Sequence, residues 1–257
     1  YINQENVVYL DLLNFILIIM LLILILIVLR KIRKIHLWSY EIQNDLENKT
    51  DNVISQIESL LGLYTDLELK KSIPKTRGWA GSPDFLWNIV RLAQKNKPLV
   101  VVECSSGVST VVLARALKLN GTGHVYSLDH DPVFAERTRE ELRRHDLSDW
   151  ATVIDAPLVD YDIKGSSWKW YSLAKFPDKI EIDLLVIDGP PASIGNLARY
   201  PAGSLLFKYL NKIGYIVLDD ANRVDEKKIC KEWEKEFSIN NVTSGDCEKG
   251  LILLQKI

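Results

Sequence analysis

The stretch that decides the fold is "VVVECSSGVSTVVLARALKLNG", which runs from Val100 to Gly121. An apolar run leads to Glu103, a turn of small residues follows, and apolar residues then recur with helical spacing. This order predicts a buried strand, a loop and a helix of an α/β sheet. Ligands of such sheets bind just beyond the carboxyl ends of the strands. The turn around Gly107 is therefore the first candidate site.

Strand and helix patterns alternate through the rest of the chain, which predicts an α/β fold with a mainly parallel, doubly wound sheet. The predicted strands lie near 99–103, 124–129, 151–154, 183–188, 215–219 and 250–255. The predicted helices lie near 84–94, 109–119, 132–144, 203–210 and 225–237. A last hairpin-like pair, 238–242 and 251–256, is expected to add an antiparallel edge.

Composition limits the possible partners. The 257 residues carry a net charge of −2, which gives no electrostatic reason to expect nucleic acid as a partner. The three cysteines have neither zinc-site spacing nor a disulfide framework, which favours a reducing compartment. The chain begins with Tyr1 rather than Met, so we expect a few residues to precede it in the native protein.

The amino-terminal segment is typical of a membrane anchor. Phe15 to Leu29 carries no charge, and the run back to Val7 gives a length that crosses a bilayer. The basic residues of "RKIRK", Arg30 to Lys34, follow the apolar run, whereas a signal peptide has its basic residues first. The positive-inside rule then places the rest of the chain in the cytoplasm. We predict a single-pass transmembrane anchor over residues 1–36.

Residues 37–73 are predicted to form a helical stalk. Leu46, Val53, Leu60 and Leu67 are spaced by sevens and give the helix one apolar seam. The seam would make a homodimer through a coiled coil, in which the membrane helix could also take part. The alternative is a helix that lies on the catalytic domain. The Gly- and Pro-rich segment that follows marks the start of a domain over residues 74–257.

The turn after the first strand selects among nucleotide-like cofactors. Gly107 is followed by Val108-Ser109-Thr110, so the Lys of a phosphate-binding loop is missing. A dinucleotide site would need three glycines for its pyrophosphate. S-adenosylmethionine carries no phosphate and is cationic at sulfur, so Glu103 suits it. Asp129, which ends the next strand, could accept hydrogen bonds from both ribose hydroxyls.

At this point the sequence resembles the class I S-adenosylmethionine-dependent methyltransferases, and more narrowly a group of small methyltransferases often found beside glycan-biosynthesis enzymes. The resemblance covers roughly residues 75–257 and rests on "RGWAGSPDFL" (Arg77–Leu86), "VVECSSGVSTVVLA" (Val101–Ala114), "SLDHD" (Ser127–Asp131), "LLVIDGPP" (Leu184–Pro191), "ARYPA" (Ala198–Ala202) and "VLDDANR" (Val217–Arg223). It implies a Rossmann-like sheet of seven strands, the last one antiparallel.

The resemblance also implies roles for single residues. It places Glu103, Ser105 and Gly107 around the methionine part of the cofactor and Asp129 on its ribose. Ser105-Ser106 stand where a second glycine is common in the family. Two further residues are assigned to cofactor binding, Ser109 at the start of the helix and Trp79, which would close over the cofactor.

Three acids follow two later strands, Asp188 in "LLVIDGPP" and Asp219-Asp220 in "IVLDDAN". Their placement resembles metal-dependent O-methyltransferases of the catechol and macrolide-sugar types, which implies a Mg²⁺ or Mn²⁺ ion that activates the substrate hydroxyl. The alternatives are that these acids cap helices or pair with Arg223. Without metal, a carboxylate such as Asp188 or Asp220, or else His130, would be the general base.

Other polar and aromatic residues have two interpretations. Arg199 and Arg223 either hold an anionic substrate or form surface ion pairs. The loop Gly165–Pro177 carries four aromatic residues, which we expect to be exposed. They would stack on a sugar, form a lid, or pack against the stalk or the membrane surface.

Together these patterns predict a membrane-anchored methyltransferase whose domain faces the cytoplasm. Its acceptor would be a hydroxyl oxygen of a glycan or lipid-linked saccharide. Two alternatives remain, a methyltransferase that acts on a lipid or phenol and a non-catalytic, methyltransferase-like scaffold in a membrane complex.

Overall fold

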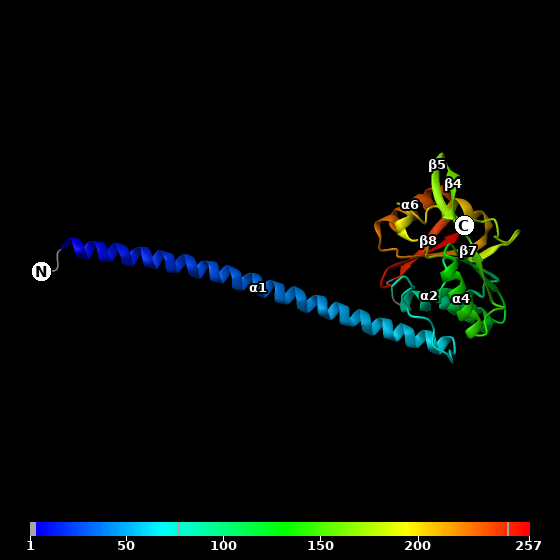
Figure 1. Cartoon of the computed structure of the whole chain (residues 1–257), viewed down its shortest axis with the longest axis horizontal. Coiled ribbons are helices and arrows are strands. Elements are labelled where there is room, and N and C mark those ends of the chain that lie inside the picture. Colours follow the sequence, from blue (N-terminus) through cyan, green and yellow to red (C-terminus); the bar gives the residue numbers. More distant parts are fainter. Residues whose placement is uncertain (1–3, 77, 246) are drawn as a thin grey trace. The chain divides into compact units, whose positions relative to one another are not determined.

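The computed structural model describes residues 4–76, 78–245 and 247–257, so Arg77 of the motif "RGWAGSPDFL" lies outside the described residues. The chain divides into two units, residues 1–54 and residues 55–257, which are described separately. The elements in chain order, labelled in part in Figure 1, are α1 (Gln4–Asp66), α2 (Pro83–Asn96), β1 (Val100–Cys104), α3 (Val108–Asn120), β2 (His124–Asp129), α4 (Pro132–Arg144), β3 (Ala151–Asp155), β4 (Leu158–Ile163), β5 (Ser166–Tyr171), β6 (Ile182–Ile187), η1 (Ala192–Ile194), α5 (Pro201–Leu206), η2 (Phe207–Tyr209), β7 (Leu210–Asp219), α6 (Val224–Glu236), β8 (Ile239–Gly245) and β9 (Leu251–Lys256).

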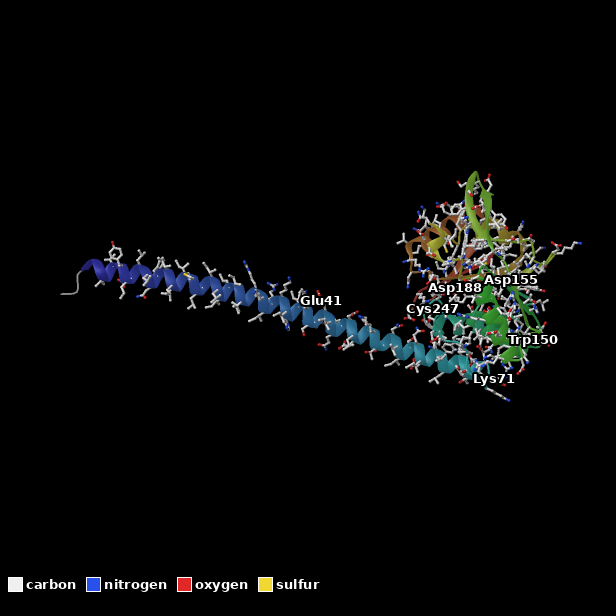
Figure 2. The ribbon with its side chains drawn as sticks, in the orientation of Figure 1. Glu41, Lys71, Trp150, Asp155, Asp188 and Cys247 are labelled. Atoms are coloured by element: carbon white, nitrogen blue, oxygen red, sulfur yellow. The ribbon has the colours of Figure 1, made fainter. Side chains whose placement is uncertain are left out.

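The first unit is the greater part of helix α1. Within the described chain, Val7–Asp66 is the one helix that is long and apolar enough to cross a membrane. None of its most apolar stretch is buried, whereas a core helix of this composition would be covered by other elements. Figure 2 shows side chains standing out from the helix on all sides, with Glu41 in its polar part. A membrane location and its orientation stay predictions.

The carboxyl-terminal turns of α1 belong to the second unit. Leu63 and the adjoining Leu67 are fully buried in its core. Gly62 lets α1 approach α2 closely, because a Cβ atom at this position would lie 2.7 Å from the Trp87 ring. Gln56 Nε2 donates to Asp84 Oδ2 over 2.8 Å, also out of solvent. These turns therefore lie on the domain, as one of the two interpretations of the predicted stalk expected.

The second unit is built on a seven-stranded sheet in the order β3-β2-β1-β6-β7-β9-β8. The neighbouring strands in the run β3-β2-β1-β6-β7 are parallel. Strand β9 runs antiparallel to both of its neighbours, β7 and β8. The predicted doubly wound sheet with one antiparallel strand is confirmed. One boundary was wrong: the helix predicted over 203–210 ends at Leu206, and β7 begins at Leu210 because Leu210 pairs with Ile182.

Alternate residues of the strands face two separate cores. Val101 of β1 packs with helices α2, α3 and α4, whereas Val102 and Cys104 pack on the opposite face. Residues of α5, α6 and the hairpin β4–β5 cover that opposite face. Because side chains alternate along a strand, Glu103 lies on the face of Val101 and meets α3. The sheet thus sends Glu103 beneath the turn that follows β1.

The aromatic loop predicted over Gly165–Pro177 is a correction. Its first part is strand β5, which pairs with β4 in the hairpin that stands out from the sheet in Figure 1. Trp170 and Tyr171 are fully buried and Phe176 nearly so, while Trp168 is half-buried. These rings were expected to be exposed, but the hairpin directs them into the core beside α5 and α6. They are therefore core residues and do not form an exposed platform.

Candidate functional site

The turn between β1 and α3 is held by a relay of hydrogen bonds. Gly107 N–H donates to Thr110 Oγ1 over 3.1 Å, and Thr110 Oγ1 donates to Glu103 Oε2 over 2.6 Å. Ser105 has φ 109°, a left-handed conformation that favours glycine. A serine therefore stands at a backbone position whose conformation favours glycine.

Glu103 lies beneath this turn and is fully buried. Its Oε2 also accepts from Ser127 Oγ over 2.7 Å, while its Oε1 has no hydrogen-bond partner among the described residues. Burial raises the pKa of Glu103 to about 6, although the nearby hydroxyls of Ser109, Thr110 and Ser127 lower it. An unpaired buried carboxylate oxygen is costly, so this oxygen is suited to a donor or cation from a bound ligand.

Asp129 ends β2 beside the same turn and is almost fully buried. Its Oδ2 accepts from Ser106 Oγ over 2.5 Å and its Oδ1 from Asp131 N–H over 3.0 Å. Ser106 in turn lies 3.0 Å from Thr138 Oγ1 of α4. The structure thus brings Glu103, Ser105, Gly107 and Asp129 to one edge of the sheet, with Ser109 in the first turn of α3.

The two remaining residues assigned to this edge are more exposed. Trp79 is 81% exposed, so it does not cover the turn in this structure. Its segment is nevertheless close to the site, because Lys249 Nζ donates to the Ala80 carbonyl and the Lys249 charge lowers the pKa of Asp188. His130 Nδ1 lies 3.9 Å from Asp129 Oδ1, on the cofactor side of the edge. Among the described residues it forms no ion pair with the three later acids.

Asp188, Asp219 and Asp220 converge as predicted at the ends of β6 and β7. One carboxylate oxygen from each lies within 4.8 Å of the other two. Asp188, labelled in Figure 2, retains 13% exposure of its side chain, whereas Asp219 is fully buried. Asp219 Oδ1 accepts from Asp220 N–H over 2.8 Å, and its Oδ2 has no partner within the described chain.

Arg199 lies inside this acidic cluster. Its Nη2 is 2.7 Å from Asp220 Oδ2 and 3.2 Å from Asp188 Oδ1, and its Nη1 donates to the Asp219 carbonyl over 2.8 Å. Only 3% of the residue is exposed, so the interpretation of Arg199 as a surface ion pair was wrong. Arg223, by contrast, is 48% exposed and pairs with Asp220 Oδ2 over 2.9 Å, as one alternative expected.

The charges of the cluster are mutually dependent. Burial raises the pKa of Asp188 to about 6, with Arg199 lowering it and Asp220 raising it. Burial and the neighbouring Asp188 and Asp220 raise the pKa of Asp219 to about 8. Burial alone would lower the pKa of Arg199, but the surrounding carboxylates raise it overall, so this guanidinium stays charged.

The contacts of Arg199 oppose the binding of a divalent metal between Asp188 and Asp220. Mg²⁺ needs carboxylate oxygens free to approach it at about 2.0–2.1 Å. Here Asp188 Oδ1 and Asp220 Oδ2 already accept charged hydrogen bonds from one guanidinium nitrogen. A cation in the same space would be repelled by Arg199 and would have to displace it. Metal binding by these acids therefore stays a prediction that the Arg199 contacts oppose.

Sequence reasoning missed three residues of this edge. Thr110 and Ser127, which hold Glu103, resemble ordinary helix and strand residues, and no local signal marks them. Tyr171 is fully buried with a hydroxyl that has no partner in the described structure, and that hydroxyl would lie 2.3 Å from a Cβ atom built on Gly189. Tyr171 belongs to the aromatic run of the sequence, but only the pairing of β5 with β4 in the hairpin fixes which of these rings are buried.

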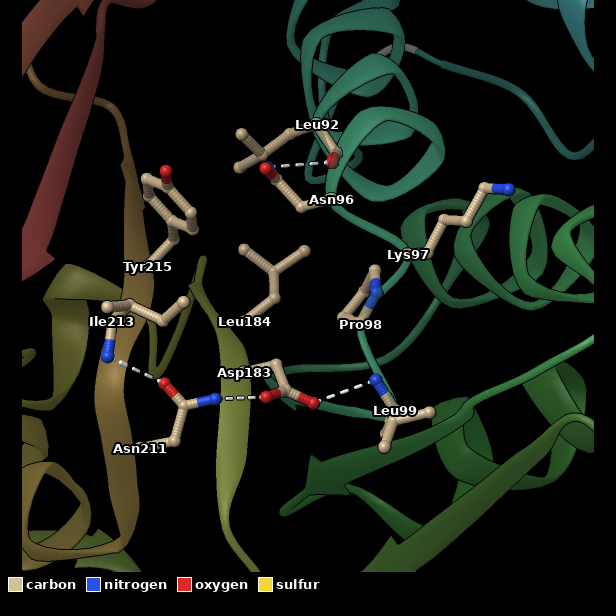
Figure 3. A pocket seen from close by; sticks show the side chains of 10 residues that line it. All are labelled: Leu92, Asn96, Lys97, Pro98, Leu99, Asp183, Leu184, Asn211, Ile213 and Tyr215. Carbon is tan, nitrogen blue, oxygen red and sulfur yellow. Dashed lines mark hydrogen bonds between the residues drawn. The ribbon is translucent and has the colours of Figure 1, made fainter.

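A pocket at the opposite edge of the sheet is a separate feature. Figure 3 shows it at the amino ends of β1 and β6, near Leu99 and Leu184. Its acid, Asp183, accepts from the backbone N–H groups of Leu99 and Val100 and from the Asn211 amide. Asp183 is thus fully used in holding strands together, and this pocket is not the candidate site.

Comparisons with known proteins agree with this fold. Residues 102–221 match the family model of a methyltransferase domain. No curated protein sequence matches the chain significantly. A methyltransferase from Podospora anserina, solved with bound SAH, is 13% identical with a TM-score of 0.58, over 82% of this chain and 96% of that one.

Two further solved structures are similar in fold. An O-methyltransferase from Bacillus cereus in complex with SAH is 15% identical with a TM-score of 0.51, over 79% of this chain and 91% of that one. An O-methyltransferase from Streptomyces achromogenes involved in tomaymycin synthesis, in complex with SAM, is 13% identical with a TM-score of 0.51, over 78% and 88%. Residues 102–221 therefore match a methyltransferase-domain model, and the chain has the fold of these S-adenosylmethionine-dependent methyltransferases and resembles the O-methyltransferases.

Proposed function

We propose that this chain is a membrane-anchored enzyme that transfers a methyl group from S-adenosylmethionine to a hydroxyl oxygen of a glycan or lipid-linked saccharide. The observation that carries the proposal is the placement of two sets of acids along one edge of the sheet. Glu103 and Asp129 end the strands beside the turn, and Asp188 and Asp220 follow the strands next to them. The cofactor and the acceptor would meet between these sets.

The cofactor side binds and orients. Asp129 would accept hydrogen bonds from the ribose hydroxyls, taking over from the bonds that it now receives from Ser106 and Asp131. The open turn at Gly107, where a Cβ atom would meet nothing within 4 Å, gives the methionine part room to lie against the backbone. When bound, S-adenosylmethionine supplies an electrophilic methyl group on a cationic sulfur.

The acceptor side supplies the base. The acceptor oxygen forms the new bond to the methyl carbon as the carbon–sulfur bond breaks, and the hydroxyl proton must leave. Asp188 is the carboxylate best placed to take that proton, because it is the most exposed of the three acids and Arg199 bonds only its Oδ1. Its Oδ2 would receive the proton, while Arg199 holds the other oxygen in position.

The acceptor class is supported by the amino-terminal helix and by the resemblance of the motifs to glycan-associated methyltransferases. A helix of this length and apolar composition would hold the enzyme at a bilayer, with the basic residues Arg30 to Lys34 on the cytoplasmic side. Anchoring concentrates an enzyme where lipid-linked substrates lie. The metal assistance expected from the sequence is not part of this proposal, because of the Arg199 contacts.

The test uses the full chain in native membranes with S-adenosylmethionine labelled in its methyl group. Membranes with the wild-type chain are compared with membranes that carry Asp129→Ala, and the lipid extract is then treated with mild acid to release saccharides from their lipid carriers. We expect label in the extract that depends on Asp129 and follows the released saccharide. Label that stays with the lipid or a phenol would support the lipid alternative, and absence of cofactor binding would support a scaffold.

The orientation has its own test. Protease added outside sealed cells should leave the domain intact if residues 37–257 are cytoplasmic. Digestion of the domain from outside would overturn the proposed orientation without affecting the assignment of the activity.

A further inference from the structure

We propose that Arg199 is the resident cation of the acidic cluster, that it takes the position of a divalent metal between Asp188 and Asp220, and that methyl transfer by this domain is independent of metal. The part about methyl transfer rests on the function proposed above. The part about the cation rests only on the contacts of Arg199, and it can be tested without a known acceptor.

The hydrogen bonds of Arg199 come from its two terminal nitrogens, while Nε forms none with the described residues. Nη2 bridges Asp188 Oδ1 and Asp220 Oδ2, and Nη1 donates to the Asp219 carbonyl at the end of β7. Nε lies 3.8 Å from Glu226 Oε1 of helix α6. One side chain therefore ties the ends of β6 and β7 to α6. A metal ion would link the same carboxylates through its coordination shell, so the guanidinium performs the same linking function.

The charge balance explains why the site holds a cation permanently. Four acids lie together, Asp188, Asp219, Asp220 and Glu226, and all but Asp188 are more than nine-tenths buried. Like charges this close destabilise one another unless a cation neutralises them. Arg199 and the outer Arg223 supply two positive charges within the ion-pair distances given above. The chain itself thus supplies two positive charges to these four acids.

Displacing Arg199 would be difficult. The side chain is 4% exposed, so removing it from its partners would leave a buried charge unpaired or require the local structure to open. A metal would also have to shed most of its water shell to enter a site that already holds a positive charge. Arg199 therefore excludes the metal by position and by charge. Removing Arg199 should convert the cluster into a metal site.

Arg223 provides a matched control. It pairs with the same oxygen of Asp220, but it is 48% exposed and lies on the outer side of the cluster. Truncating Arg223 removes one positive charge from the cluster while Arg199 stays between the carboxylates. If charge alone decided metal binding, both truncations would admit a metal. If the position of Arg199 decides it, only truncation of Arg199 will.

The experiment titrates Mn²⁺ into the full chain in detergent and measures the free ion by electron paramagnetic resonance, with calorimetry in parallel. We expect no binding to wild type or to Arg223→Ala at millimolar Mn²⁺. The affinity of Arg199→Ala for Mn²⁺ should exceed the upper limit measured for wild type by more than about tenfold, because the positive charge between the carboxylates has been removed. Mn²⁺ should also raise the melting temperature of Arg199→Ala, and adding Asp220→Asn should abolish both effects.

Binding of Mn²⁺ to the wild-type chain that Asp220→Asn abolishes would overturn the proposal. If Arg199→Ala does not fold, the wild-type titration still decides, together with Arg199→Lys, which keeps a cation and should bind no Mn²⁺. Cofactor binding is measured separately by titrating S-adenosylmethionine into the wild-type chain. Its failure would overturn the proposed function and leave the Mn²⁺ result readable.

Discussion

The two halves of the candidate site use the same residue type in opposite ways. At the ends of β1 and β2, Glu103 and Asp129 are held by hydroxyls and backbone N–H groups. At the ends of β6 and β7, Asp188 and Asp220 are held by guanidinium groups. A carboxylate that accepts from neutral donors can exchange those hydrogen bonds for hydrogen bonds from a ligand. A buried cation, by contrast, holds a carboxylate in one position. The half with Glu103 and Asp129 can therefore exchange its hydrogen bonds, and we call it the exchangeable half. The half with Asp188 and Asp220 is a fixed network of charges, and we call it the fixed half.

The largest expected effect tests the fixed half. Arg199→Ala should lower the free energy of unfolding by about 3–5 kcal/mol, because it leaves buried carboxylates without their cation. Arg223→Ala should cost about 1 kcal/mol or less, because an exposed pair contributes little. Chemical denaturation of the full chain in detergent measures both. If both variants lose the same free energy of unfolding, the burial of Arg199 does not determine its contribution to stability.

The exchangeable half is tested by cofactor affinity. Asp129→Ala should weaken the binding of S-adenosylmethionine by about 3 kcal/mol, roughly a hundredfold, since about 1.5–3 kcal/mol is lost for each charge-assisted hydrogen bond. Asp220→Ala serves as the contrast and should leave cofactor affinity within about tenfold, because its partners lie on the other half. Isothermal titration of the full chain is the measurement. An unchanged affinity in Asp129→Ala would contradict the ribose assignment.

The burial of Glu103 predicts a dependence on pH. Its pKa is raised from 4.5 in the unfolded chain to about 6, so its favourable contribution is complete below pH 4.5 and is lost as pH rises through 6. Glu103→Gln should therefore stabilise the chain by about 2 kcal/mol at pH 8 and change little at pH 4. Melting curves at the two pH values measure this. A constant difference across pH would mean that Glu103 does not carry its raised pKa.

The smallest effect concerns the backbone of the turn. Ser105→Gly should relieve a left-handed serine and stabilise the chain by about 1 kcal/mol, net of the larger entropy of glycine in the unfolded state. Ser106→Gly is the matched control and should destabilise, because it loses the bonds to Asp129 and Thr138. Thermal melts of both variants give the comparison. Destabilisation by Ser105→Gly would mean that the serine side chain outweighs the strain.

The sequence predicted the parts of the site that depend on strand order. Glu103, Asp129 and Asp188 each follow an apolar run, and the carboxyl ends of parallel strands meet at one edge. That rule is enough to place these acids together before any coordinates are known. The hairpin β4–β5 was missed although its two strands are adjacent in the chain, and the start of β7 at Leu210 was missed because pairing with the distant Ile182 decides it. The local pattern around Leu210 does not indicate that it pairs with Ile182.

The partners of the acids could not be predicted in the same way. Arg199 lies in "ARYPA", eleven residues after Asp188 and twenty before Asp219, and no spacing indicates that it turns inward between them. Its position depends on how the segment before α5 crosses the strand ends. The sequence also does not indicate the roles of Thr110 and Ser127, because a hydroxyl residue beneath a turn has no distinct local pattern. The sequence indicates that a cation neutralises the three acids, but the cation predicted from it is a metal ion rather than Arg199.

The packing of the end of α1 into the core has a practical consequence for separating the domain from the apolar part of this helix. Leu63 and Leu67 fill the core, and Gly62 lies against Trp87. A soluble fragment that starts at Pro74 would lose these side chains and expose the apolar surface that they cover, which favours aggregation. A fragment that starts near Ser55 would retain them. The place to separate the domain from the apolar helix therefore lies inside α1 rather than at the Gly- and Pro-rich segment.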